Sequence, residues 1–213
     1  MRSDLSSESH PRVERVAKRR AVRIALRIGA VGVSAVLALA SASRNATAQD
    51  VLPREAAVEV RRNFLVDLDT LQSKFLALAE AIPAEKYTWR PKDGVRSIGE
   101  AFMHVASEYY VFTPMAYGAE ASPLIPRSRE GFQSFEKASS KDDVLKHLKE
   151  GFAYTKQSLN GLDAAAITGT KKLFGGDRTI VETSLIMSGD LHEHLGQLIA
   201  YARMNDVKPP WSK

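Results

Sequence analysis

Three side chains of the sequence, His104, Asp190 and His194, have the types and the spacing of ligands for a divalent metal ion. Asp190 and His194 are four residues apart, so on a helix they share one face with their Cβ atoms roughly 5–6 Å apart. Such a pair can chelate one ion, or the carboxylate can hold the imidazole in one tautomer. If the helix of His104 lies beside theirs, two neutral imidazoles and one carboxylate converge. That set leaves positions for water, as in an open catalytic metal site.

Other polar side chains lie on the same flank of the last predicted helix. A projection at about 100° per residue places Gln197 and Tyr201 near His194, at the edge of the apolar stripe. We expect these two residues to support the metal ligands. The neighbouring His192 is excluded from the site, because its imidazole points about 160° away from that of His194.

Glu108 and two aromatic residues complete the candidate site. Glu108 follows His104 by four residues, and we expect it to be a surface partner of that imidazole rather than a ligand. Tyr87 and Trp89 precede this helix and can either cap the bundle or wall a pocket. Each histidine has an alternative role, because a histidine beside an apolar stripe can be a hydrogen-bonded core residue.

Four stretches with apolar residues at intervals of three and four predict the helices that would position these side chains. They span about residues 54–82, 98–118, 140–161 and 179–205. Ser97 to Glu100 reads as a capping box for the second helix, and Pro114 is expected to kink or end it. The connections 119–139 and 162–178 show no clear period and are expected to be loops, the first with at most a helical turn. The pattern predicts an all-α fold, a four-helix bundle, as one domain over residues 49–213.

Residues 1–48 are expected to be a signal peptide. Seven Lys or Arg residues between Arg12 and Arg27 precede 13 uncharged residues, Ile28–Ala40, and small residues then lead to Ala48. The apolar run is shorter than the about 20 residues that span a bilayer, and the order is that of a secretory signal. Cleavage near Ala48 would give an exported protein, periplasmic or secreted, that meets a membrane only during export. The alternative is an uncleaved amphipathic or anchoring helix.

Composition excludes several classes of function. The chain has no cysteine, which excludes disulfide scaffolds, thiolate metal sites and thiol nucleophiles. Residues 1–48 hold nine Lys/Arg and three Asp/Glu, which leaves 21 basic and 22 acidic residues in the rest. Because that remainder carries a net charge of −1, we expect no binding to nucleic acid. Gly175-Gly176 is expected to be a turn rather than a phosphate loop, since no Lys-Ser/Thr follows.

Two segments of the sequence resemble motifs of the DinB/YfiT-like superfamily. One contains Tyr87-Thr88-Trp89-Arg90-Pro91 and continues to His104, and the other contains Asp190 to Arg203 with a His-Leu-Gly-Gln run at His194. The resemblance implies a four-helix bundle, often a dimer, in which one histidine of the second helix and two of the last bind a divalent metal. Carried over, the ligands are His104 and His194, and Asp190 stands where the family has its other histidine.

The resemblance also implies the function, since members of known activity include thiol-dependent transferases and isomerases. We expect a divalent-metal-dependent transferase or hydrolase that acts on an unidentified small molecule. A homodimer is consistent with the same resemblance. Zinc is the first expectation for the metal, and nickel, manganese or iron are alternatives, because a carboxylate can ligate each of them. The replacement at Asp190 supports a second hypothesis: a non-catalytic bundle that has lost its metal and acts in dimerisation or ligand binding.

Overall fold

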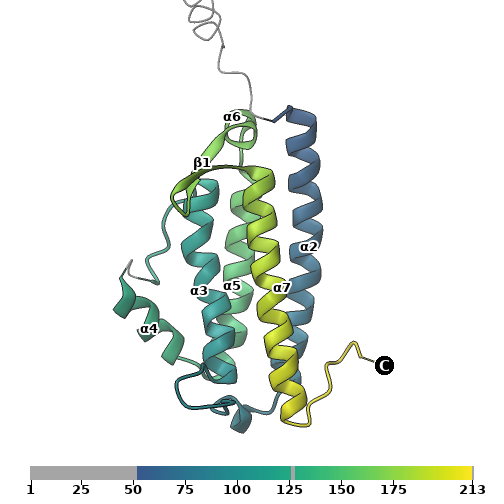
Figure 1. The fold of residues 1–213 in the computed structure, drawn as a ribbon, viewed down its shortest axis with the longest axis vertical. Helices are drawn as coiled ribbons and strands as arrows, with labels where there is room; N and C mark the ends of the chain where they lie inside the picture. The colour runs from purple at the N-terminus through teal and green to yellow at the C-terminus, as the bar shows by residue number, and fades with distance from the viewer. Residues whose placement is uncertain (1–51, 126–127, 213) are drawn as a thin grey trace, which may run out of the picture. The chain divides into compact units, whose positions relative to one another are not determined.

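Four long helices form the bundle that the apolar periodicity predicts (Figure 1). The computed structural model describes residues 52–125 and 128–212 of the chain. The predicted all-α class is confirmed, and the helix bounds lie within one or two residues of those expected. The bundle helices are α2 (Arg54–Ala81), α3 (Ile98–Tyr117), α5 (Lys141–Asn160) and α7 (Ile180–Met204).

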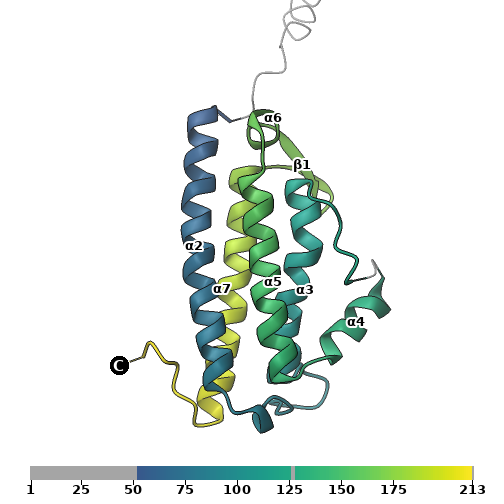
Figure 2. The same cartoon turned by 180° about the vertical axis from the view of Figure 1, so that it is seen from behind.

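Each bundle helix packs against two others: α2 contacts α5 and α7, and α3 contacts the same two helices. Two helices, α2 and α7, run in one direction and the other two run in the opposite direction (Figures 1 and 2). The helices α3 and α7 are therefore antiparallel neighbours. This is the adjacency that the predicted metal site requires and that periodicity alone cannot establish.

Four aromatic rings are among the largest fully buried side chains of the core between the helices. Phe75, Phe102, Tyr109 and Phe152 are fully buried, and the ring centroids of Tyr109 and Phe152 are 4.4 Å apart. Burying one large apolar side chain stabilises a fold by about 1.5–3 kcal/mol. Because Tyr109 lies on α3 and packs against Phe152 of α5, the preceding residue, Glu108, is left on the side of α3 that faces α7.

The ends of α3 are set by local sequence signals. The Ser97 side chain accepts a hydrogen bond from the Glu100 amide, and the Glu100 carboxylate accepts one from the Ser97 amide at 2.7 Å, so the predicted capping box is present. Pro114 does not end the helix, which continues to Tyr117. Gly118 ends it with a left-handed backbone, φ 70°, a conformation that glycine adopts without strain.

The two connections hold more regular structure than the sequence predicts. The first contains α4 (Arg129–Lys137), and the second contains α6 (Ala164–Thr168) and an antiparallel hairpin of β1 (Thr170–Leu173) and β2 (Gly176–Thr179). Neither strand sequence, Thr-Lys-Lys-Leu or Gly-Asp-Arg-Thr, alternates apolar and polar residues, so periodicity does not reveal the hairpin. The hairpin turn has positive φ at Phe174 (49°) and Gly175 (76°), as in a type I′ turn, so the predicted turn at this point is confirmed.

The predicted signal peptide, residues 1–48, lies outside the described residues, which belong to the unit Asp50–Lys213. Within the part of the chain that the structure describes, none of the helices is both long and apolar enough to cross a membrane. Export therefore stays a prediction.

Gly99, in the first turn of α3, lies against the chain segment that precedes α5. A Cβ added at Gly99 would lie 2.4 Å from the carbonyl oxygen of Ser139 and 3.2 Å from the ring of Tyr87. Because the nearer atom belongs to the backbone, Gly99→Ala must displace α3 or this segment, and we expect a loss of about 2 kcal/mol in the free energy of unfolding. Urea unfolding measures it.

The matched control for this substitution is Gly189→Ala in α7, where an added Cβ meets nothing within 4 Å. Alanine in an open helix interior is favoured over glycine by up to about 1 kcal/mol, so this control is expected to gain stability. Equal effects of the two substitutions would contradict the close approach at Gly99.

Candidate metal centre

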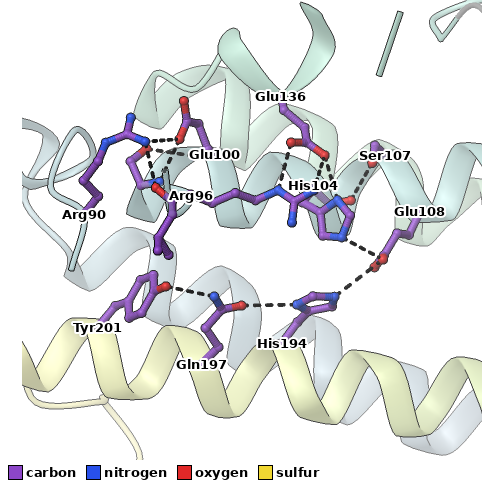
Figure 3. Close-up of polar contacts among 12 residues, drawn as sticks. Arg90, Arg96, Glu100, His104, Ser107, Glu108, Glu136, His194, Gln197 and Tyr201 are labelled. Carbon is purple, nitrogen blue, oxygen red and sulfur yellow. Dashed lines mark hydrogen bonds and ion pairs between the residues drawn. The ribbon is translucent and has the colours of Figure 1, made fainter. Parts of the chain in front are cut away.

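Two side chains of α3 and one of α7 converge at the seam between these helices (Figure 3). Each of His104, Glu108 and His194 offers one ligand atom, and the three atoms lie within 4.8 Å of one another. Glu108 Oε1 is 3.1 Å from His104 Nε2 and 3.5 Å from His194 Nε2. The two imidazole rings stand edge to face with centroids 5.0 Å apart. The structure thus brings together the two histidines that the sequence singled out.

The carboxylate that lies between these imidazoles is Glu108, which was expected to be a partner of His104 rather than a ligand. Asp190 Oδ1 is 3.7 Å from His194 Nε2, and its side chain is 36% exposed, against 10% for Glu108. Asp190 therefore lies at the rim of the cluster. The sequence contains a signal for Glu108 as a ligand: it follows His104 by four residues on α3, the same spacing that separates Asp190 and His194 on α7.

Opposite charges set the protonation of the cluster. Burial alone would lower the pKa of His104, but hydrogen bonds to Glu108 and Glu136 raise that pKa to about 9. Burial alone would raise the pKa of Glu108, but the two imidazoles lower it to about 2. At neutral pH the metal-free cluster therefore holds the Glu108 carboxylate beside the His104 imidazolium. Burial and the charge of Glu108 raise the pKa of Asp190 to about 6.

Each imidazole of the cluster is oriented by a second polar group at its Nδ1 atom. His104 Nδ1 is 2.7 Å from Glu136 Oε1, and Arg96 holds both oxygens of Glu136 at 2.9 and 3.1 Å. His194 Nδ1 is 3.3 Å from Gln197 Oε1. In consequence both Nε2 atoms face Glu108 (Figure 3).

Of these orienting groups, Gln197 and Tyr201 were expected from the helical projection. Gln197 Nε2 donates to Tyr201 Oη at 2.9 Å, so the hydroxyl fixes the amide that holds His194. Glu136 was missed, because it lies on α4, in a segment whose sequence shows no clear period.

The donor set fits a divalent cation. Two imidazole nitrogens and one carboxylate are ligands that zinc, nickel, manganese and iron accept. Glu108 Oε2 is buried and has no hydrogen-bond partner, so a second carboxylate oxygen is free to bind an ion. The Nδ1 contacts resemble the outer hydrogen bonds that orient metal-binding histidines.

An open cleft of about 1130 Å³ meets the cluster at His104 and Gln197. Its walls are the segment that precedes α3 and one face of α4. Glu108 and His194 do not line the cleft, so the cluster lies at its inner edge.

The remaining sequence candidates lie away from this cleft. Tyr87 is buried, and its hydroxyl donates to the carbonyl of Ala79 at 2.7 Å. Trp89 packs edge-on against Tyr201 with centroids 5.5 Å apart. Neither ring lines the cleft, so their contacts are those of the capping alternative. His192 Nε2 contacts Asp67 of α2 at 3.0 Å and points away from the cluster, as the helical projection predicts.

The comparison with protein families agrees with this geometry. The sequence model of the DinB superfamily matches residues 67–198, a range that includes all of α3 and most of α7. A comparison with curated proteins gives no match. The match covers more than half of the chain, and it contains every residue of the candidate metal centre. The resemblance drawn from the two sequence segments is therefore confirmed, and the chain belongs to the DinB superfamily.

Proposed function

We propose that the protein is a divalent-metal-dependent enzyme, a transferase or hydrolase that acts on a small molecule. The observation that carries the proposal is the convergence of His104 Nε2, His194 Nε2 and Glu108 at the inner edge of an open cleft. Zinc is the first candidate for the ion, with nickel, manganese and iron as alternatives. Thiol-dependent transfer is the activity that the family resemblance favours.

The chemistry that a bound divalent ion supplies is Lewis acidity, which lowers the pKa of a coordinated group. The protein's own residues hold and orient the ligands: Glu136 fixes His104, and Gln197 fixes His194. Asp190 lies at the rim of the cluster, 3.7 Å from His194 Nε2, where its carboxylate is placed to accept or return a proton.

Metal analysis of the purified full chain tests the proposal. We expect about one ion per chain after dialysis against zinc and removal of free metal, as for a mononuclear site. The double variant His104→Ala, His194→Ala is expected to retain almost none. The matched control is His192→Ala, which removes an exposed imidazole of the same helix that contacts Asp67 instead. Metal content that is near zero in the wild type, or equal in all three proteins, would refute the proposal.

A second function is favoured by one observation. Without metal, the carboxylate of Glu108 is already balanced by the imidazole of His104 at 3.1 Å, so the cluster can serve as a buried ion pair of a non-catalytic bundle. Such a bundle would act in dimerisation or ligand binding. Its melting temperature would not depend on metal, whereas an ion that binds only the native state raises it.

Export and cleavage near Ala48 are part of the proposal. They are supported by the cationic segment, the short apolar run and the small residues of the first 48 positions. Amino-terminal sequencing of the protein recovered from its expressing cells tests them. A mature chain that begins near Gln49 is the expected result.

A further inference from the structure

We propose that the cleft beside His104 binds the oxyanion group, a carboxylate or a phosphate, of a small organic molecule. The inference rests on the proposed function in one respect only: the molecule bound there would be the substrate on which the metal centre acts. The binding itself requires no metal.

One face of α4 supplies the first wall of this anion site. Arg129, Gln133 and Lys137 line the cleft at intervals of four residues, so their side chains follow one helix face. The opposite face is anchored by Phe135, whose ring packs against His147 with centroids 4.9 Å apart. This anchoring turns the two cations of α4 toward the cleft rather than toward the bundle.

The segment before α3 supplies two further cations, but these are neutralised. Arg90 Nη1 is 3.1 Å from the Glu100 carboxylate, and Arg96 pairs with Glu136 at 2.9 Å. Figure 3 shows these two pairs, and all four side chains line the cleft.

The two cations of α4, in contrast, have no carboxylate partner among the residues that the structure describes. Across residues 52–125 and 128–212, Arg129 and Lys137 make no ion pair or side-chain hydrogen bond. With His104 counted as neutral, the cleft lining therefore carries a net charge of +2, whereas residues 49–213 together carry −1. A concentration of one charge in a cleft focuses the field and attracts a ligand of opposite charge.

The shape and lining of the cleft favour an organic anion over a bare ion. Val95 and Phe132 give the lining an apolar part, on which the carbon body of a ligand can pack. Arg129 offers a planar fork that matches the geometry of a carboxylate or a phosphate, and Lys137 offers a point charge. His104 lines the same cleft, so a molecule bound there would share the cavity with one candidate ligand of the metal centre.

Calorimetric titration of the full chain, stripped of metal and then dialysed free of chelator, tests this inference, with inorganic phosphate, phenyl phosphate and benzoate as probes. We expect saturable binding of phenyl phosphate or benzoate, tighter than that of inorganic phosphate because of the apolar wall, and weaker at high salt. The probe that binds more tightly shows whether the oxyanion is a phosphate or a carboxylate. The double variant Arg129→Gln, Lys137→Gln is expected to weaken binding about tenfold or more, since two charge-assisted hydrogen bonds are lost.

The matched control removes the same charge elsewhere: Lys146→Gln with Lys149→Gln on exposed positions of α5, outside the cleft. It should bind the probes as the wild type does. The charge-preserving variant Arg129→Lys, Lys137→Arg should restore most of the binding. The inference is overturned if no probe saturates, if the α4 variant binds like the wild type, or if the control loses as much.

The zinc-induced rise in melting temperature, measured on the same proteins, separates this inference from the proposed function. We expect the α4 double variant to keep that rise, because neither residue contacts the three candidate ligands. Anion binding without a response to zinc, nickel, manganese or iron would refute the metal centre and leave the anion site standing. A zinc response without anion binding would refute the anion site and leave the metal centre standing.

Discussion

Glu108→Gln is expected to abolish the zinc-induced stabilisation of the protein, whereas Asp190→Asn is expected to retain most of it. Glu108 Oε1 lies 3.1 and 3.5 Å from the two imidazole nitrogens, while Asp190 Oδ1 lies 3.7 Å from one of them. Glutamine fills the same space without a negative charge. The loss of the anionic ligand should weaken zinc binding about 100-fold or more, since even groups outside the ligand set are worth about 10–100-fold.

Thermal unfolding gives this difference a measurable size. Zinc at about 100 times its dissociation constant stabilises the native state by about 2.7 kcal/mol, which raises the melting temperature by roughly 5–10 °C in a chain of this length. At the same zinc concentration, a 100-fold weaker site gains only about 0.4 kcal/mol, or a rise of about 1 °C. If Asp190→Asn loses the rise and Glu108→Gln keeps it, Asp190 is the ligand, as the family spacing implies.

The metal-free protein is expected to lose stability as the pH rises from 6.5 to 9. The pKa of His104 is about 9 in the folded chain and 6.5 ordinarily. A raised pKa stabilises the folded state fully below pH 6.5, and this stabilisation is lost as the pH rises through 9. The difference between the two pKa values corresponds to about 3 kcal/mol in the free energy of unfolding. The raised pKa of Asp190, about 6, has the same sign, since its contribution is lost as the pH rises through 6. Urea unfolding in EDTA at pH 6 and pH 9 measures the loss.

Zinc affinity is expected to follow the opposite trend. His104 must give up a proton before its Nε2 atom can bind an ion, so the affinity should rise about tenfold per pH unit between pH 6 and 8. Competition with a chromophoric chelator measures the affinity. The control is Glu136→Gln, which removes one of the two carboxylates that raise the pKa of His104, so both pH dependences should become shallower. Stability that is constant or that increases toward pH 9 would contradict this account.

Much of the fold could be predicted from the sequence, because each bundle helix buries one continuous apolar stripe. The start of α3 was also predictable, since the capping box at Ser97 is a local signal. The α4 segment was not, because a helix of nine residues without any buried side chain has too few apolar positions to show a period. The direction of α5 relative to α3 depends on the path of the connection that contains α4. A helical projection gives no information about that path.

The candidate site was predictable in part for a related reason. A helical projection gives the angle of a side chain around the axis of its own helix, so it placed His104 and His194 each at the edge of an apolar stripe. It gives no height of one helix against another, and this height decides that Glu108, rather than Asp190, lies between the two imidazoles. Glu136 could not be found, since it comes from an element that the sequence did not reveal.

The crossover from α3 to α5 has a consequence for how the protein can diversify. It carries α4, and therefore much of the cleft wall, on a connection that contributes few side chains to the packed interior. Surface connections tolerate changes of length and composition far better than the elements they join. Under the proposed function, substrate preference can thus be rewritten by grafting new crossovers between fixed helices, as long as each graft keeps a carboxylate in the place of Glu136 to orient His104.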